Sequence, residues 1–224
     1  MLNAVIFDFD GIIVDTEPLH YRAFQELLAP LGLGYSWEEY LETYLGFDDR
    51  DAFREAFSAG GRPLSDQELK SLINGKAEAF IRIVSVGVAP YPGVVELIRS
   101  ISGVLPLALC SGALRSDIDP ILVQLGLTGA FDTLVTADEV AASKPDPESY
   151  RLAVQRLQDI FPGRVDPAAS FAIEDTPAGI ASAKGAGLNV LAVTNSYPKE
   201  RLTGACLVVD SLATMDIEGL RLLI

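Results

Sequence analysis

Two pairs of acidic residues, each placed directly after a short apolar run, are the side chains in this sequence whose chemistry stands out. Asp8 and Asp10 follow the apolar run 4–7, and Glu174 and Asp175 follow another such run. Gathered carboxylates repel one another unless a cation joins them, and hard oxygen ligands suit Mg²⁺. Taken singly, an Asp after a strand is a common turn former, and the second pair is equally compatible with capping a helix. The four carboxylates together favour a metal site.

A hydroxyl group and a lysine supply two further features that phosphoryl chemistry needs. Ser111 and Gly112 follow the apolar run 105–110, and a hydroxyl beside a free backbone amide is a cradle for phosphate oxygens. On its own, however, Ser-Gly is more simply explained as a turn. Lys144 is a cation of the kind needed where four carboxylates and a phosphoryl group converge, although a lone loop lysine is usually solvated. Cys110 has no histidine placed to activate it, so we interpret it as a core residue.

These residues require a scaffold that brings the ends of strands together. Runs that are apolar throughout, rather than alternating, are typical of strands buried on both faces of a parallel sheet. Helical patterns separate most of the runs, which predicts a doubly wound α/β domain. In such a sheet, ligands bind outside the carboxyl ends of the strands, where both acidic pairs stand. The predicted strands cover residues 4–7, 105–110, 133–136, 171–173 and 189–193.

Residues 16–87 contain no strand-like run and are predicted to form an all-helical insert directly after the first strand. Two capping-box sequences, beginning at Ser36 and Ser65, each predict the start of a helix within this insert. We therefore predict two domains. A parallel-sheet core comprises residues 1–15 and 88–224, and a helical cap comprises residues 16–87.

The composition excludes several classes of protein. A chain of 224 residues with 49% hydrophobic and 21% charged residues is typical of a globular protein, not of a disordered or fibrous one. The net charge of −14 disfavours nucleic acid and anionic membranes as partners. The apolar stretches are far shorter than the ~20 residues of a membrane helix, and residues 1–3 lack the basic region of a secretory signal. Cys110 and Cys206 form no disulfide framework or zinc spacing, so we expect a cytoplasmic protein. We also expect a monomer.

Four short motifs occur in the order that is typical of the haloacid-dehalogenase-like phosphotransferase superfamily, and the chain resembles that superfamily over nearly its whole length. The helical insert falls where the superfamily carries its small α-helical cap. Three stretches, 8–17, 139–147 and 174–187, resemble the branch that holds β-phosphoglucomutase and phosphoglycolate-phosphatase-like enzymes. The four motifs are Asp8-x-Asp10-Gly11, Ser111, Lys144-Pro145 and Glu174-Asp175.

The resemblance implies a role for each matching residue of the core. Asp8 is expected to be the nucleophile that forms an aspartyl-phosphate. Asp10 is expected to act first as the general acid for the leaving oxygen and then as the base for the incoming water or alcohol. Ser111 and the amide of Gly112 are expected to bind phosphoryl oxygens, and Lys144 is expected to offset the charge around Asp8. These roles agree with phosphoryl transfer, which depends mainly on alignment and on neutralised charge.

The resemblance also implies that Mg²⁺ is the cofactor. The expected ligands are Asp8, the backbone carbonyl of Asp10, and Asp175, with Glu174 close by.

The helical cap is where the members of this branch differ. His20, the only histidine, and Lys76 resemble cap residues that the mutases use to handle protons and to hold a second phosphate. A lone histidine on a helix more often serves packing, and Lys76 is equally compatible with a surface position. The mutases also carry a cap arginine beside a glycine-led loop, whereas here Asp49 stands at that position and Arg50 follows it. We treat His20, Lys76 and Arg50 as candidate substrate-binding residues and expect Asp49 to repel a second phosphate.

We therefore predict a Mg²⁺-dependent phosphatase whose partner is a small phosphorylated metabolite. The alternative enzyme is a β-phosphoglucomutase-like mutase of sugar phosphates. A phospho-accepting receiver-type signalling module has similar carboxylates and a lysine, but it lacks a helical insert of this size. A catalytically silent binding protein is disfavoured because all the catalytic residue types are present. A true dehalogenase needs no metal cluster, so the acidic pairs are evidence against it.

Overall fold

The apolar runs of the sequence form one six-stranded sheet in the computed structural model, which describes residues 1–223. Its strands are β1 (Ala4–Phe7), β2 (Leu107–Cys110), β3 (Thr133–Val135), β4 (Ser170–Glu174), β5 (Asn189–Val193) and β6 (Leu207–Val209). All neighbouring strands are parallel, in the order β3-β2-β1-β4-β5-β6. The central strands β2, β1 and β4 are buried along their whole length, as their uninterrupted apolar character predicts.

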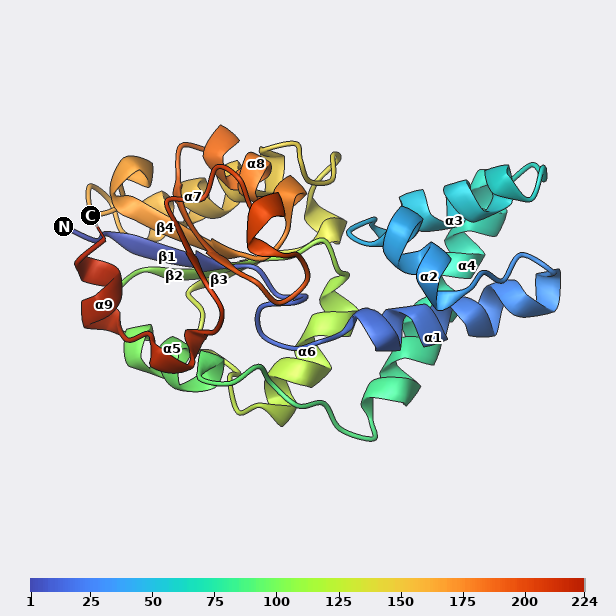
Figure 1. Cartoon of the computed structure of the whole chain (residues 1–224), viewed down its shortest axis with the longest axis horizontal. Helices are drawn as coiled ribbons and strands as arrows, with labels where there is room; N and C mark the ends of the chain where they lie inside the picture. Colours follow the sequence, from blue (N-terminus) through green and yellow to red (C-terminus); the bar gives the residue numbers. More distant parts are fainter. Residues whose placement is uncertain (224) are drawn as a thin grey trace.

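Helices cover both faces of this sheet because each strand sends alternate side chains to opposite sides. They are α5 (Val94–Ile101), α6 (Arg115–Gln124), α7 (Glu148–Ile160), α8 (Pro177–Gly185) and α9 (Ile217–Arg221). Ala4 and Ile6 of β1 pack with α7 and α8, whereas Val5 and Phe7 pack with α5, α6 and α9. Figure 1 shows these two groups of helices on opposite sides of the sheet. The predicted doubly wound α/β fold is confirmed.

The predicted strands differ from the structure at several ends, and one strand was missed. The strand β3 ends one residue before the end of the predicted 133–136, and β4 extends one residue beyond each end of the predicted 171–173. The strand predicted at 105–110 begins only at Leu107. The strand β6 at the edge of the sheet was missed, because its three half-buried residues are shorter than the run that marks a buried strand.

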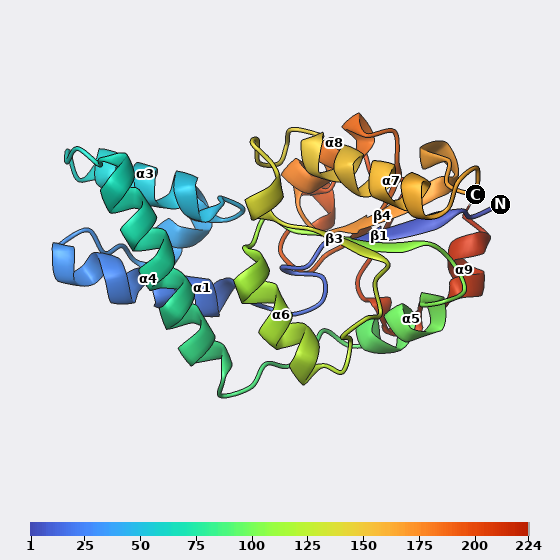
Figure 2. The same cartoon turned by 180° about the vertical axis from the view of Figure 1, so that it is seen from behind.

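Residues 16–87 form a second, helical lobe that Figure 2 shows at the end of the molecule opposite both termini. Its helices are α1 (Glu17–Leu28), α2 (Trp37–Glu39), α3 (Asp49–Ala59) and α4 (Asp66–Val84), with a π-helix at Tyr40–Tyr44. Phe24, Tyr40 and Phe53 belong to a separate hydrophobic cluster within this lobe. The expected helices are present, and the domain boundaries at residues 15–16 and 87–88 stay a prediction. Within residues 1–223, no helix has the length and apolar character needed to cross a membrane.

The two capping-box predictions have different outcomes. At Ser65 the box is complete, because the Ser65 side chain accepts a hydrogen bond from the Glu68 amide and Glu68 accepts one from the Ser65 amide. At Ser36 only the first of these bonds forms, from the amide of Glu39.

Replacing the helix-capping hydroxyl should destabilise the helical lobe. We expect Ser65→Ala to lower the free energy of unfolding by ~1 kcal/mol, because the first turn of α4 loses its cap. The matched control is Ser71→Ala, which removes an exposed hydroxyl that donates to the Gln67 carbonyl within the same helix. That change should stay within about 0.5 kcal/mol. Urea unfolding followed by far-UV circular dichroism measures both, and equal losses would contradict the capping assignment.

Candidate active site

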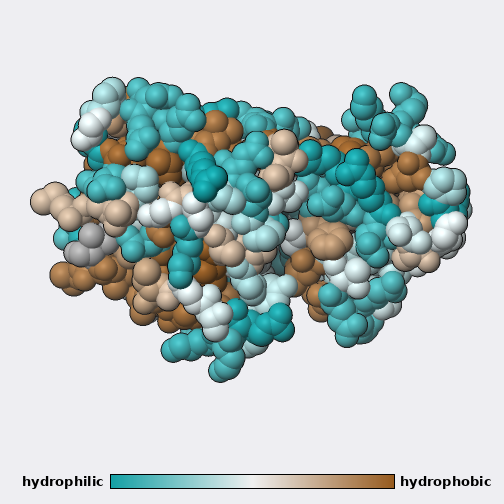
Figure 3. Space-filling model, turned by 90° about the horizontal axis from the view of Figure 1, so that it is seen from above, coloured by the Kyte–Doolittle hydropathy of each residue, from teal (hydrophilic) through white to brown (hydrophobic). Residues whose placement is uncertain are grey.

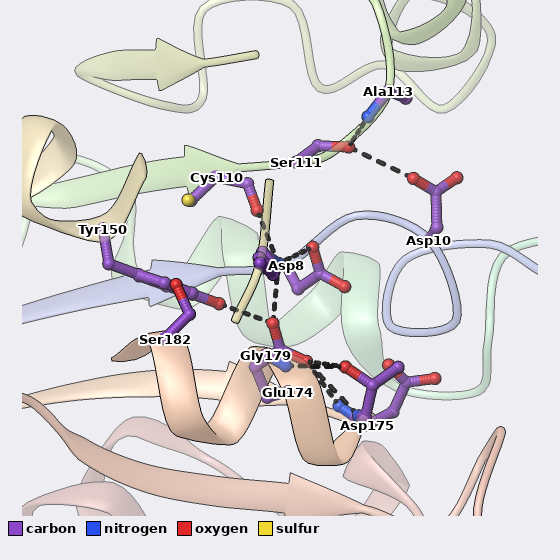
Figure 4. A network of polar contacts seen from close by, with 12 residues as sticks. Asp8, Asp10, Cys110, Ser111, Ala113, Tyr150, Glu174, Asp175, Gly179 and Ser182 are labelled. Carbon is purple, nitrogen blue, oxygen red and sulfur yellow. Dashed lines mark hydrogen bonds and ion pairs between the residues drawn. The ribbon is translucent and has the colours of Figure 1, made fainter. Parts of the chain in front are cut away.

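The predicted catalytic residues of the core converge at the carboxyl ends of three neighbouring strands. Asp8 directly follows β1, Ser111 directly follows β2, and Glu174 is the last residue of β4. Because β2, β1 and β4 are adjacent and parallel, these three positions lie along one edge of the sheet. Lys144 reaches the same place from the loop that precedes α7. Figure 4 shows Asp8 at the centre of the resulting polar network.

The ammonium group of Lys144 joins the first acidic pair to the second. Its Nζ donates to Asp8 Oδ1 at 2.7 Å and to Glu174 Oε1 at 2.6 Å. It also lies 3.4 Å from the carbonyl oxygen of Cys110 and 5.0 Å from the centre of the Tyr150 ring. Burial alone would lower the pKa of this ammonium, but the charges of Asp8 and Glu174 raise it well above its usual value. Lys144 is therefore a permanent cation in the site.

Both carboxylate oxygens of Glu174 accept hydrogen bonds that hold the side chain in place. Its Oε1 accepts a hydrogen bond from the Tyr150 hydroxyl at 2.8 Å in addition to the one from Lys144. Its Oε2 accepts from the amide of Asp175 at 3.1 Å and from the hydroxyl of Thr176 at 3.2 Å. The backbone of α8 comes so close that a Cβ added at Gly179 would stand 1.9 Å from Glu174 Oε1. Glu174 thus holds Lys144 against Asp8.

Asp8, Glu174 and Asp175 form a group that could hold a metal ion. One carboxylate oxygen of each lies within 4.8 Å of the others, and all three residues are buried. Asp175 Oδ2 accepts a hydrogen bond from Ser196, whereas the buried Oδ1 has no hydrogen-bond partner among residues 1–223. An oxygen-only donor set with one unsatisfied carboxylate oxygen fits Mg²⁺.

The pKa values of two of these carboxyl groups express the same surplus of negative charge. Burial, followed by the charge of Glu174, raises the pKa of Asp8 to about 8 despite the neighbouring Lys144. Burial, followed by the charges of Glu174 and Asp8, raises the pKa of Asp175 well above its usual value. One ammonium group therefore does not neutralise three clustered acids, and a second cation would stabilise their ionised forms.

Asp10 lies apart from this group, on the side of Ser111 (Figure 4). Its Oδ1 accepts a hydrogen bond from the Thr16 hydroxyl and lies 3.4 Å from His20 Nε2, and its Oδ2 accepts from Ser111 at 3.1 Å. Burial raises the pKa of Asp10, but the hydrogen bond and charge of His20, with the two hydroxyl groups, outweigh it and lower the pKa to about 2. The side chain of Asp10 is thus placed for proton transfer rather than for the group of three carboxylates.

Gly11 is required where it stands. Its φ of +79° lies in the left-handed region, and an added Cβ would stand 1.9 Å from Asp175 Oδ2. The turn at this glycine brings the backbone close to the second acidic pair.

Several residues that contact the site were missed in the sequence, among them Thr176, whose hydroxyl donates to Glu174. Thr16 and Ser196 donate to the acidic residues Asp10 and Asp175, Tyr150 donates to Glu174, and Asn195 Nδ2 donates to the Gly11 carbonyl at 2.6 Å. The sequence could have indicated Asn195 and Ser196, because, like Asp8, they come shortly after the end of a buried strand, here β5. Thr16 and Tyr150 lie beside or within helices, and no such pattern marks them.

A cavity of about 90 Å³ lies between the two lobes, above the strand ends. Figure 3 shows the surface hollowed where the lobes meet. From the core it is lined by residues that include Asp8, Asp10, Gly112 and Lys144, and from the helical lobe by residues that include His20 and Asp49.

The candidate cap residues have different placements. His20 lines the cavity and stacks on Phe80, with ring centres 4.3 Å apart. Arg50 lies outside the lining of this cavity and pairs with Asp48 at 2.6 Å. Lys76 also lies outside it, where it is fully buried. The structure therefore brings only His20 of these three predicted residues to the wall of the catalytic cavity.

Comparison with known proteins agrees with this geometry. The family described as haloacid dehalogenase-like hydrolase matches residues 5–193. Fructose-1-phosphate phosphatase YqaB of Escherichia coli is 31% identical over 189 residues, which cover 84% of this chain and 95% of YqaB. A crystal structure of a CbbY variant from Rhodobacter sphaeroides in complex with xylulose 1,5-bisphosphate has a TM-score of 0.88 and 28% identity, covering 98% of this chain and 99% of CbbY. β-Phosphoglucomutase of Clostridium difficile has a TM-score of 0.87 and 25% identity, covering 100% and 97%.

These matches confirm the predicted superfamily and the predicted parallel α/β fold, and the named phosphatase supports the predicted class of enzyme. They also exclude the receiver-type signalling module as a description of this chain. The chain belongs to the haloacid dehalogenase-like hydrolases.

Proposed function

We propose that the chain is a Mg²⁺-dependent phosphatase that hydrolyses a small carbohydrate phosphomonoester through an aspartyl-phosphate on Asp8. The observation that carries this proposal is the placement of Asp8 at the floor of the cavity, with its Oδ1 held by Lys144 at 2.7 Å. The activity named for YqaB supports a carbohydrate monoester as the substrate. A cytoplasmic location and a monomeric state remain expectations from the sequence.

In the first step, a carboxylate oxygen of Asp8 attacks phosphorus and the bond between phosphorus and the leaving oxygen breaks. Lys144 offsets the charge of the reacting carboxylate, while Ser111 and the Gly112 amide are the groups proposed to bind phosphoryl oxygens. In the second step, water gives a proton to Asp10 and attacks phosphorus, and the bond between phosphorus and the Asp8 oxygen breaks, which releases phosphate and restores the Asp8 carboxylate. Covalent catalysis by a carboxylate thus divides one difficult displacement into two easier ones.

The proton for the leaving oxygen is proposed to come from the pair formed by Asp10 and His20. With a pKa of about 2, Asp10 is ionised in the structure and is ready to act as a base. His20 Nε2 lies 3.4 Å from Asp10 Oδ1 and can return a proton to it. Both residues line the cavity, within reach of a substrate bound there.

Asp8 and Asp175 are the proposed side-chain ligands of Mg²⁺, with Glu174 close by and the backbone carbonyl of Asp10 as a further ligand. The unsatisfied Oδ1 of Asp175 supports this assignment. When bound, Mg²⁺ supplies positive charge that offsets the charge of the phosphoryl oxygens.

The pairing of the cap cations favours a hydrolase over a mutase. A mutase must hold a second phosphate in its cap, and a buried dianion requires fixed cations that are free to meet it. Here Arg50 pairs with Asp48, and Lys76 pairs with Asp49 and Asp117. Each cation is therefore already balanced by at least one carboxylate, so the cap offers no surplus positive charge to a second phosphate.

The covalent mechanism is tested by Asp8→Asn. The amide is a poor nucleophile, so we expect phosphate release to fall by at least ~10³-fold while circular dichroism stays unchanged. Retention of more than about a tenth of the rate would contradict a nucleophilic role for Asp8.

The role of Asp10 is tested by the dependence on the leaving group. We expect Asp10→Asn to lose ~10²–10⁴-fold with an alkyl phosphate, the usual contribution of a general acid–base. The loss should be smaller with p-nitrophenyl phosphate, because its leaving group has a low pKa and needs less help from a proton. Equal losses with the two substrates, measured when phosphorylation limits the rate, would count against Asp10 as the acid.

Removing the metal should reveal the charge imbalance of the site. Chelation should stop phosphate release, and Mg²⁺ should restore it.

The effect of Mg²⁺ on stability should depend on pH. Because the pKa of Asp8 is about 8 in the fold and its ordinary value is 3.8, the folded chain binds this proton more tightly than the unfolded chain. The stability that the proton contributes is therefore present at low pH and is lost as the pH rises through about 8. The rise in Tm caused by Mg²⁺ should accordingly be larger at about pH 8 than at about pH 6.

The matched variant for this measurement is Asp175→Asn, which removes one proposed ligand and one negative charge. Its metal-free Tm should equal or exceed that of the wild type, and its response to Mg²⁺ should be lost. A Mg²⁺ response that is independent of pH, or that persists in Asp175→Asn, would contradict the proposed metal site.

A further inference from the structure

Three charged residues, Asp49, Lys76 and Asp117, form a buried triad that joins the helical lobe to the sheet lobe. Lys76 Nζ lies 2.9 Å from Asp49 Oδ1 on α3 and 2.9 Å from Asp117 Oδ2 on α6. It also lies over the rings of Phe24 and Phe80, at 5.4 and 4.9 Å from their centres. The Lys76 side chain is 0% exposed, and an ammonium so buried must keep its carboxylate partners.

Only one oxygen of Asp49 is used in this triad. The other oxygen, Oδ2, is buried and has no hydrogen-bond partner among residues 1–223. Buried carboxylate oxygens normally accept hydrogen bonds, so an unused one needs an explanation. The position of Asp49 in the first turn of α3 explains an acidic residue type, because it complements the helix dipole. It does not explain why the carboxylate points to Lys76 and leaves one buried oxygen unused.

Asp49 stands where two cavities adjoin. The catalytic cavity, of about 90 Å³, and a second cavity, of about 190 Å³, share Asp48, Asp49 and Gly112 in their linings. The second cavity adds apolar walls from both lobes, among them Ile73 and Leu114. A leaving group that extends outward from a phosphoryl group at Asp8 would therefore pass Asp49.

We propose, on the basis of the phosphatase function above, that Asp49 is a specificity-determining residue. Its carboxylate group, which lies in the lining of both cavities, attracts a hydroxyl or ammonium group of the substrate's leaving group, and Lys76 and Asp117 hold it in position. The substrate class is a monophosphate whose leaving group carries hydrogen-bond donors and no second anion.

The charge of the triad determines which leaving groups are favoured and which are disfavoured. Two carboxylates and one ammonium group leave the triad with a net negative charge, and Arg50, which also lines the second cavity, is paired with Asp48. A second phosphate placed there is repelled, whereas a hydroxyl or ammonium group is attracted.

The test compares two substrates that differ only in a second phosphate, fructose 1-phosphate and fructose 1,6-bisphosphate. Values of kcat/KM are measured on the full Mg²⁺-loaded chain as wild type, as Asp49→Asn, and as the control Asp51→Asn. Asp51 lies two residues further along α3 and is exposed, so the control removes the same charge from the same helix away from the cavities. Circular dichroism checks the fold of each variant.

The wild type should prefer the monophosphate. In Asp49→Asn, the ratio of kcat/KM for the bisphosphate to that for the monophosphate should rise at least about tenfold, because one unit charge a few ångström away is removed. In Asp51→Asn the ratio should stay within about twofold of the wild type, since exposed charges are screened.

Two results would overturn the proposal. The first is a higher kcat/KM of the wild type for the bisphosphate than for the monophosphate, a result that can be obtained without any variant. The second is that the ratio of kcat/KM for the bisphosphate to that for the monophosphate is the same in Asp49→Asn and Asp51→Asn.

Phenyl phosphate serves as a third substrate for the wild type, because its leaving group has neither hydrogen-bond donors nor a second anion. If it is hydrolysed while the ratio fails to change, only the role of Asp49 is wrong. If no substrate releases phosphate, the proposed function fails, and the role of Asp49 fails with it.

Discussion

The ion pairs of Lys144 with Asp8 and Glu174 are the interaction on which the arrangement of this site depends. Three carboxylates are buried together at the ends of two neighbouring strands, and a single ammonium group lies between two of them. In a low-dielectric environment their mutual repulsion would oppose the close approach of β1 and β4. The lysine comes from a loop 136 residues away from Asp8 in sequence, so folding of the whole sheet lobe is required to position it.

The backbone around the acidic group is adapted to this crowding. Gly11 and Gly179 stand where a Cβ would lie 1.9 Å from oxygens of Asp175 and Glu174, respectively. Because neither glycine has a side chain, the main chain can pack directly against these two carboxylates. The raised pKa values of Asp8 and Asp175 show that the group is still incompletely neutralised. Such residual repulsion lowers the stability of the metal-free fold, and a cation bound at the proposed metal site would relieve it.

The sequence predicted those parts of the fold and site that depend on local pattern. Because the central strands are buried on both faces, their apolar runs stood out, and the acids directly after them marked one edge of the sheet. The edge strand β6 was missed because its run is short and only half-buried, and the hydroxyl donor Tyr150 was missed because its partner Glu174 lies 24 positions away in sequence. The pairing of Lys76 with Asp117 was missed for the same reason: the two residues are 41 positions apart and lie on different lobes. The sequence shows which residues are charged, but it does not show which oppositely charged residue each of them pairs with in the fold.

The two ends of the cavity differ in how their charges are balanced, and this difference can orient a substrate. At the strand ends, acids exceed bases, and in the proposed function a bound cation together with Lys144 would make this the end that accepts a phosphoryl group. In the helical lobe, Arg50 is balanced by Asp48, and Lys76 is outnumbered by two carboxylates. Under that proposal, a phosphate dianion finds uncompensated positive charge beside Asp8 once the metal is bound. In the proposed mechanism, the electrostatic field thus selects one direction of binding before any contact with the leaving group is made, so that Asp8 meets phosphorus rather than the far end of the substrate.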